Sequence, residues 1–141
     1  MAKIYRSMKK ANDGKPVVDD SGKGLGVRGV PVNGKIDVDL DQDGNVVLND
    51  KGMSVAPAWR LLPYYLVPMH LAGKFPGARG KNLHCFTMGD GPFEDGPVAE
   101  GLDLKRDRPE HGNVVPRASV RLDQFQTDLA NTRDRWVEDE A

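Results

Sequence analysis

Glycine and proline recur so often along the chain that long regular elements have little room. The 141 residues include 16 glycines and 10 prolines, almost a fifth of the sequence. Glycine costs backbone entropy inside helices and strands, and proline removes a hydrogen-bond donor. We therefore expect short strands, many turns and few helices. Only 38% of the residues are hydrophobic, so the core should be modest, and the length fits one domain spanning residues 1–141.

The charge balance does not indicate a polyanionic partner. Lys and Arg total 20 against 21 for Asp and Glu, which gives a net charge of −1, so neither nucleic acid nor an acidic membrane is implied. The start of the sequence lacks the apolar core of a signal peptide. The most apolar window, 55–73, is broken by prolines and contains Arg60 and His70, so it fails as a membrane span. We expect a protein that acts in the cytoplasm.

The single cysteine, Cys85, excludes an internal disulfide framework and a zinc site made of several cysteines. His84 precedes it in the sequence. Neighbouring residues on a strand face opposite ways, however, so this pair cannot share a proton as a catalytic dyad would. We interpret Cys85 as a thiol of the core.

Hydrophobic periodicity places the expected elements. Alternation with period two predicts strands, and spacings of three and four predict a helix. The pattern predicts a strand at 3–8, a hairpin at 35–49, strands at 82–88, 101–105 and 111–116, and an amphipathic helix whose apolar stripe runs from Leu122 to Trp136. Residues 9–33 and 89–100 are expected to be loops. This order favours an α+β domain with a mostly antiparallel sheet.

The stretch 51–60 combines a candidate functional side chain with the start of the apolar segment. Ser54 follows the flexible Gly52 and precedes the β-branched Val55, which suits a hydroxyl presented at a strand end or turn. Pro57 fits the first turn of a short helix carrying Trp59. A serine that merely satisfies a turn backbone is the alternative.

Arg6, on the first expected strand beside Tyr5, can anchor a phosphate because a guanidinium fork fits phosphate oxygens bidentately. A solvated edge-strand arginine is the other interpretation. Residues 24–29 have the glycine spacing of a dinucleotide fingerprint, but Val30 and Pro31 follow where that motif needs a helix. We therefore do not assign a Rossmann site there.

The turn of the expected hairpin carries acidic residues at alternate positions. Asp39, Asp41 and Asp43 precede Gly44, and Asp50 stands at the twelfth place of an EF-hand-like loop. The flanking residues alternate with period two, and Asp-Gly is itself a preferred hairpin turn. A calcium-binding β module is an alternative that this pattern leaves open.

Short blocks spread along the chain carry a resemblance to a known family. They are Ile4–Arg6, Gly52–Val55, His111–Pro116, Leu122–Phe125 and Trp136. In the same order, these blocks resemble a family of bacterial cytotoxins exported by type VI secretion systems. That family has an ADP-ribosyltransferase-like fold, with a split, mostly antiparallel sheet, a few short helices and a C-terminal helix.

The resemblance implies a function and a set of site residues. It implies a toxin that uses nicotinamide adenine dinucleotide (NAD), bound between two small sheets without a metal, to modify an unidentified acceptor in a recipient cell. A cognate immunity or antitoxin protein would neutralise it. The residues that it implies are Ser54, His111 and Gln126 for catalysis, with Tyr5, Arg6, Gly52, Met53 and Ser54 for NAD binding. We expect the side chains of Arg6 and Ser54 to face ligand more than core.

The sequence departs from familiar transferases at their catalytic glutamate. The nearest spacing here is Gln124-Phe-Gln126, which keeps hydrogen bonding but lacks the negative charge that stabilises an oxocarbenium-like transition state. Either Glu94, Glu100 or Glu110 supplies that charge from a loop, or the protein is not a conventional transferase. A non-enzymatic interaction protein with a degenerate transferase fold is therefore a further alternative.

Overall fold

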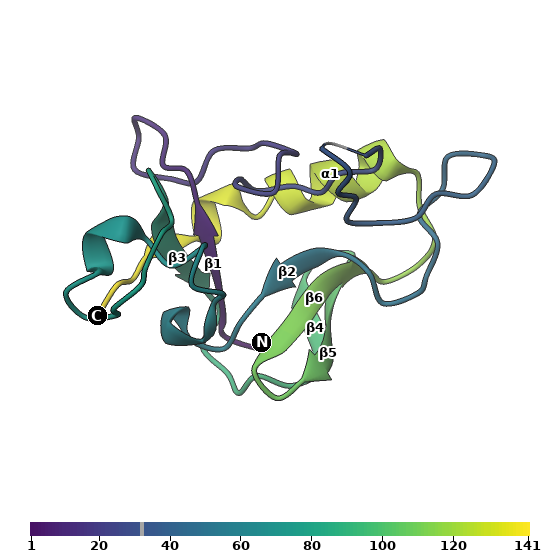
Figure 1. The fold of residues 1–141 in the computed structure, drawn as a ribbon. Coiled ribbons are helices and arrows are strands. Elements are labelled where there is room, and N and C mark those ends of the chain that lie inside the picture. Colours follow the sequence, from purple (N-terminus) through teal and green to yellow (C-terminus); the bar gives the residue numbers. More distant parts are fainter. Residues whose placement is uncertain (32) are drawn as a thin grey trace.

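A computed structural model describes residues 1–31 and 33–141 and shows an α+β domain with mostly antiparallel sheets and one α-helix (Figure 1). The strands are β1 (Ile4–Met8), β2 (Met53–Val55), β3 (His84–Met88), β4 (Gly96–Ala99), β5 (Leu102–Arg108), β6 (His111–Pro116) and β7 (Val137–Glu138). The helices are α1 (Leu122–Ala130) and the 3₁₀ turns η1 (Trp59–Leu61), η2 (Met69–Leu71) and η3 (Arg133–Arg135). No helix in the described ranges has the length and apolar character needed to cross a membrane.

Four strands form an antiparallel sheet in the order β2-β6-β5-β4. Its register places Met53 opposite Val114 and Ser54 opposite Asn113. Gly52 lies just before β2, where a Cβ atom would collide with the carbonyl oxygen of Val114. The absence of a side chain there lets the two backbones approach closely enough to pair.

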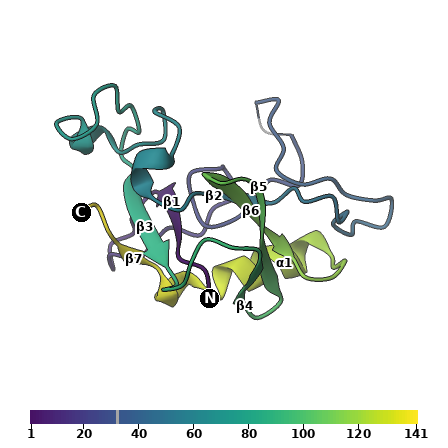
Figure 2. The ribbon, with the colours of Figure 1, turned by 90° about the horizontal axis from the view of Figure 1, so that it is seen from below.

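The other sheet has three antiparallel strands, with β3 between β1 and β7. Arg6 is opposite Phe86, and Phe86 is opposite Glu138 on its other side. The two sheets lie beside each other (Figure 2), and a single antiparallel bridge between Tyr5 and Ala56 joins β1 to the segment after β2. Beyond that bridge the edges of the two sheets separate.

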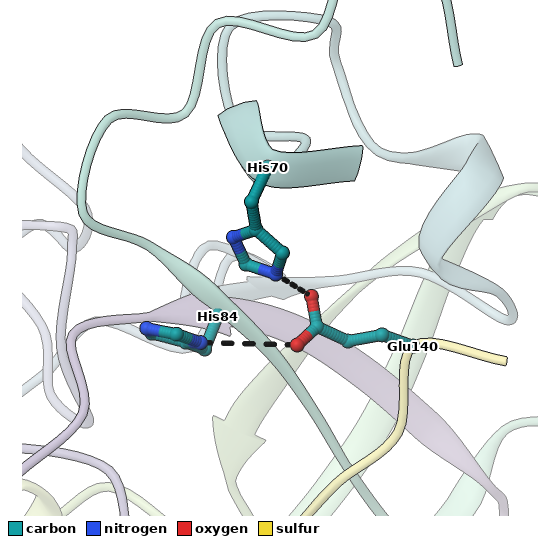
Figure 3. A group of neighbouring side chains, drawn as sticks. All are labelled: His70, His84 and Glu140. Carbon is teal, nitrogen blue, oxygen red and sulfur yellow. Dashed lines mark hydrogen bonds and ion pairs between the residues drawn. The ribbon is translucent and has the colours of Figure 1, made fainter. Parts of the chain in front are cut away.

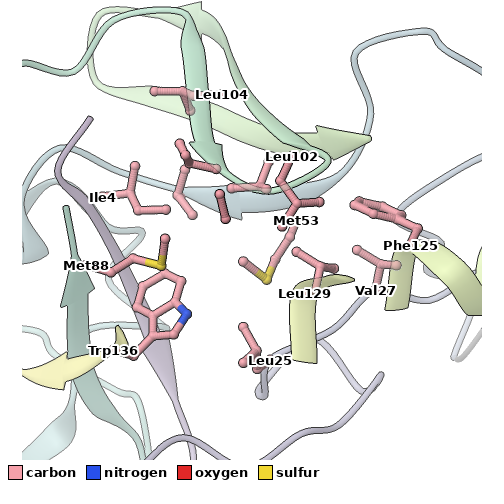
Figure 4. Packing of buried hydrophobic residues seen from close by; sticks show 14 of the residues in the cluster. Ile4, Leu25, Val27, Met53, Met88, Leu102, Leu104, Phe125, Leu129 and Trp136 are labelled. Carbon is pink, nitrogen blue, oxygen red and sulfur yellow. The ribbon is translucent and has the colours of Figure 1, made fainter. Parts of the chain in front are cut away.

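Two apolar clusters hold these layers together. The larger lies between the two sheets and α1, and it includes Ile4, Met53, Leu104, Phe125 and Trp136 (Figure 4). The smaller covers the opposite face of the three-stranded sheet, where Trp59, Val67 and Leu71 pack with Cys85. The structure thus confirms Cys85 as a core thiol, and burial raises the pKa of that thiol.

Several predicted elements differ from those observed. The terminal helix ends at Ala130, and Trp136 follows the separate turn η3 instead of extending that helix. At this break the Thr132 hydroxyl donates to the Leu129 carbonyl and accepts a hydrogen bond from the Trp136 indole N–H. The expected hairpin at 35–49 contains only one bridge, between Leu40 and Val46. β4 lies within the loop expected at 89–100, and β7 was not predicted.

Candidate functional site

Two clefts open where the edges of the sheets separate, and Arg6, Ser54, Tyr65 and Leu66 line both of them. The smaller has a volume of about 210 Å³. We call it the histidine cleft, because its wall also includes His111, together with Leu61, Leu62 and Arg108. The larger, of about 800 Å³, is the basic groove, lined in addition by Ser21, Lys23, Arg28, Lys35, Asp37 and Arg79.

Ser54 occupies the junction of the two clefts because of its place on β2. Met53 and Val55 on either side are buried, so strand alternation turns the exposed Ser54 to the polar face of the sheet. Its Oγ donates a hydrogen bond to Asn113 Oδ1 at 3.4 Å, and Asn113 Nδ2 donates to the Asp50 carbonyl at 3.0 Å. The serine hydroxyl is thus accessible and lightly held.

Arg6 is buried, with only 7% of its surface exposed. Its guanidinium donates to the carbonyl oxygens of Gly24 at 3.1 Å, Gly22 at 3.2 Å and Ser54 at 2.8 Å. Burial lowers the pKa of Arg6 to about 10, so the group keeps its charge at neutral pH. The expected exposure of this side chain to ligand is therefore wrong. The hydrogen bonds of the guanidinium connect β1 to β2 and to the loop at 22–24.

The basic groove carries an excess of positive charge. Among the described residues of its wall the only carboxylate is Asp37, and both of its oxygens accept hydrogen bonds from the Arg28 guanidinium at 3.0 Å. This pairing raises the pKa of Arg28. Lys23, Lys35 and Arg79 are exposed and make no side-chain hydrogen bond or ion pair with the part of the chain that is described. These three cations can bind an anion such as a phosphate.

The histidine cleft contains a paired imidazole. His111 Nδ1 lies 2.7 Å from Asp107 Oδ1, four residues earlier on the neighbouring strand β5. Burial is the largest single influence and raises the pKa of Asp107, but the hydrogen bond and charge of His111, the backbone and the charge of Arg108 together outweigh it, and the pKa falls below its usual value. A carboxylate that accepts the Nδ1 proton leaves Nε2 as the proton acceptor, the tautomer that a general base requires.

The remaining predicted site residues lie outside the two clefts. Gly52 and Met53 support the pairing of β2 and the core. The Tyr5 hydroxyl donates to Asp139 at 2.9 Å. Gln126, on α1, donates to the Val27 carbonyl at 3.1 Å and lines a separate hollow. The structure therefore brings together Arg6, Ser54 and His111 but not Tyr5 or Gln126.

None of the three glutamates considered as replacements for the catalytic glutamate of familiar transferases lines either cleft. Glu94 is exposed in the segment before β4. Glu100 borders another hollow beside α1. Glu110, in the turn between β5 and β6, lies 3.5 Å from Arg108 in an ion pair and is next to His111 in sequence. It is the only one of the three adjacent to a residue of the histidine cleft.

Sequence reasoning missed several side chains of the clefts. Lys35, Tyr65, Arg79 and Arg108 come from four separate loops or strand ends, and no local motif links them. For Tyr65 the sequence did offer a signal. Tyr64 and Tyr65 are adjacent in a segment broken by prolines, so both rings cannot be buried and one of them is available to line a surface cleft. Tyr65 is 53% exposed, and its ring packs edge-on against that of Tyr64.

The acidic turn uses its carboxylates within the chain. Asp39 accepts bonds from Lys51 Nζ at 2.9 Å and Asn49 Nδ2 at 2.7 Å, which holds its pKa below the usual value. Asp41 accepts the backbone N–H groups of Asp43 and Asn45. These contacts compete with calcium. Within the described ranges, one group of potential metal ligands lies close together, and it comprises His70, His84 and Glu140 (Figure 3).

Comparison of the chain with protein-family models, with curated proteins and with solved structures finds no match. The function is therefore argued from the two clefts and from the residues that line them.

Proposed function

We propose that the protein binds NAD across the two clefts and consumes it, as the resemblance to secreted ADP-ribosyltransferase-like toxins implies. The observation that carries this proposal is the junction at Ser54. There, a groove with three uncompensated cations meets a smaller cleft that contains a paired histidine. A dinucleotide needs both features, because it has a charged pyrophosphate next to the ribose at which the reaction occurs.

The walls suggest how NAD would be bound. Lys35 and Arg79 supply exposed cations for the pyrophosphate. The exposed ring of Tyr65 borders both clefts and offers a face on which a base can stack. Ser54, at the junction, would then donate or accept a hydrogen bond at the ribose. Arg6 shapes this junction by holding β1 against β2 and does not anchor a phosphate with its full fork.

The chemistry requires the bond between ribose C1′ and the nicotinamide nitrogen to break. The bonding electrons move to the nicotinamide ring and neutralise its positive charge. Water or an acceptor hydroxyl then attacks C1′, and its proton passes to Nε2 of His111, which Asp107 orients through Nδ1. Before that transfer the Asp107 carboxylate supplies part of the negative charge that the absent glutamate would provide, and afterwards it stabilises the imidazolium that forms.

The toxin part of this proposal rests on the family resemblance. It includes delivery into a recipient cell and a cognate immunity protein that blocks the site. The chemistry of the groove specifies that partner further, since Lys23, Lys35 and Arg79 would be covered best by an acidic surface.

The test is to measure NAD binding by calorimetry and NAD loss by chromatography with the purified protein. Removing one phosphate contact in Arg79→Gln should weaken NAD binding about tenfold. His111→Gln should bind NAD normally and lower turnover by about 100-fold or more, because a general base is lost. The matched control is Arg121→Gln, since Arg121 is an exposed arginine that lines neither cleft.

Three other results would lead to different conclusions. If Arg121→Gln weakens NAD binding as much as Arg79→Gln, binding is non-specific and the groove assignment fails. If wild-type protein does not bind NAD, the proposal is wrong. If NAD binds but is never consumed, a non-enzymatic protein is favoured. This is the second candidate function, because no glutamate is among the described residues that line the two clefts.

A further inference from the structure

A second group of chemically active side chains lies where η2, the start of β3 and the segment after β7 meet. His70 is on η2, His84 begins β3, and Glu140 follows β7. Their nitrogen and oxygen ligand atoms all lie within 4.8 Å of one another. In Figure 3 both imidazole rings direct a nitrogen at the Glu140 carboxylate, one toward each oxygen.

We propose that His70, His84 and Glu140 form a binding site for a divalent cation of the zinc class. In a tetrahedral zinc site with bonds of about 2.0–2.2 Å, neighbouring ligand atoms lie about 3.4 Å apart. His70 Nε2 lies 2.5 Å from Glu140 Oε2, and His84 Nδ1 lies 3.8 Å from Oε1. These distances bracket the required value, so small side-chain rotations would bring all three groups into coordination.

His84 provides an independent observation that points to a ligand. Its Nδ1 atom is excluded from solvent and makes no hydrogen bond of good geometry with the described residues. The Glu138 carboxylate approaches it to 2.8 Å as an ion pair, but Glu138 is shared with Lys10, whose Nζ lies 3.2 Å away. A buried polar atom without a partner costs free energy. A cation bound to its lone pair would remove that cost.

The ligand types select the class of metal. Two imidazole nitrogens and one carboxylate oxygen suit zinc and its transition-metal neighbours, whereas calcium and magnesium prefer oxygen ligands alone. Three protein ligands leave a fourth position of a tetrahedral ion for water. Cys85 is not part of the group, because strand alternation directs it into the smaller apolar cluster.

A cation at this position would join three distant parts of the chain. The segment after β7 already contacts the three-stranded sheet, since Asp139 donates its backbone N–H to the Cys85 carbonyl at 2.9 Å. It also contacts η1, where the Trp59 indole donates to the Ala141 carbonyl at 2.9 Å. Metal bound by Glu140 and the two histidines would fix this segment over the smaller cluster, so we expect it to stabilise the fold.

The experiment titrates Zn²⁺ alone into chelator-treated protein and follows heat and melting temperature. Wild type should bind one equivalent and melt at a higher temperature, because a ligand of the native state stabilises it. His70→Ala, His84→Ala and Glu140→Gln should each weaken affinity by about 100-fold or more, since outer-shell changes alone cost up to that much. His111→Ala, which removes the third histidine of the chain, should retain wild-type affinity for zinc.

Two measurements keep the test decisive. The His70 side chain is 47% exposed, so His70→Ala should fold even if His84→Ala does not. Co²⁺ added to wild type should give the visible absorption of a tetrahedral site, and zinc should displace it. The proposal is overturned if wild type binds no zinc, or if His70→Ala binds it as tightly as wild type. Neither measurement involves NAD, so this result is independent of the function proposed above.

Discussion

The two sheets of this protein are assembled in different ways. In the four-stranded sheet, β4, β5 and β6 follow one another along the chain and are joined by two-residue turns at 100–101 and 109–110. The three-stranded sheet combines β1, β3 and β7, which come from distant segments. The first sheet depends largely on local pairing, whereas the second requires the chain to close long loops.

The faces of the two sheets differ as well. The four-stranded sheet has one apolar face and one polar face, and the polar face carries Ser54 and Asn113 beside the clefts. The three-stranded sheet is covered on both faces, with Phe86 in the larger cluster and Cys85 in the smaller. We conclude that changes to the three-stranded sheet and its contacts should mainly cost stability. Changes to the polar face of the other sheet should mainly cost function.

The largest effect should come from Trp136, which is 1% exposed and leads directly into β7. Trp136→Ala removes a buried aromatic ring and leaves the Thr132 hydroxyl without its indole partner, so it should lower the free energy of unfolding by about 3–5 kcal/mol. Urea denaturation followed by circular dichroism measures this loss. Trp136→Phe, which keeps most of the ring volume, should cost much less.

The same variant tests whether the two sheets unfold as one unit. Trp59 remains in the smaller cluster and reports on it by fluorescence, while circular dichroism reports on all strands. Coincident transitions would show that the locally paired sheet cannot persist without the distant one. Loss of the Trp59 signal at lower urea than the dichroism would separate the sheets. A Trp136→Ala protein as stable as wild type would show that the end of the chain is not part of the core.

The next effect concerns Arg6, whose guanidinium links the two sheets across their separation. Arg6→Met keeps an apolar stem but leaves the carbonyls of Gly22, Gly24 and Ser54 without this donor, which should cost about 2–3 kcal/mol. Ser54→Ala, at an exposed position of the same junction, should cost less than about 1 kcal/mol. Both values come from urea denaturation.

The activities of these two variants sharpen the comparison. Ser54→Ala should reduce NAD consumption while remaining folded, because it removes a hydrogen bond at the proposed reaction site. Equal stability of Arg6→Met and wild type would contradict a structural role for Arg6. It would mean that water replaces the guanidinium easily, and the original interpretation of Arg6 as a phosphate anchor would become the better one.

The sequence predicted best those elements whose partners are close in the chain or whose pattern is strictly local. The expected strand at 111–116 matches β6, and Ser54, whose hydroxyl was expected to be presented at a strand end or turn, is exposed on the short strand β2. The hairpin at 35–49 was overestimated, because Val38 is buried while Ile36 is 40% exposed, so the alternating residues do not share one covered face. Alternating apolar residues indicate a strand only where another part of the fold packs against the face that they share.

Contacts between distant segments could not be predicted in this way. The strand pattern gave the position of Arg6 but not the return of the loop at 22–24 that occupies its guanidinium. His70, His84 and Glu140 meet only because η2, β3 and the segment after β7 pack together, and their spacing along the chain matches no metal motif. Candidate site residues were found where the backbone presents them locally, and were missed where folding brings them together.

The smallest effect should come from an ion pair on the side of the three-stranded sheet. Arg133, in η3, binds both oxygens of Asp13 at 2.7 and 2.8 Å, and so ties the loop after β1 to the segment before β7. The hydrogen bonds from Arg133, followed by that from the Lys15 N–H, lower the pKa of Asp13 below its usual 3.8. Because the folded-state pKa of Asp13 is depressed, this stabilisation is present above the ordinary aspartate pKa and is lost as pH falls through the lowered pKa.

Arg133→Gln should therefore lower the melting temperature slightly at neutral pH, and the difference from wild type should shrink in acid and in high salt. Lys81→Gln is the control, since Lys81 is exposed and makes no ion pair within the described residues. A difference that persists unchanged in acid would show that Arg133 acts through its bond to the Pro16 carbonyl and not through Asp13.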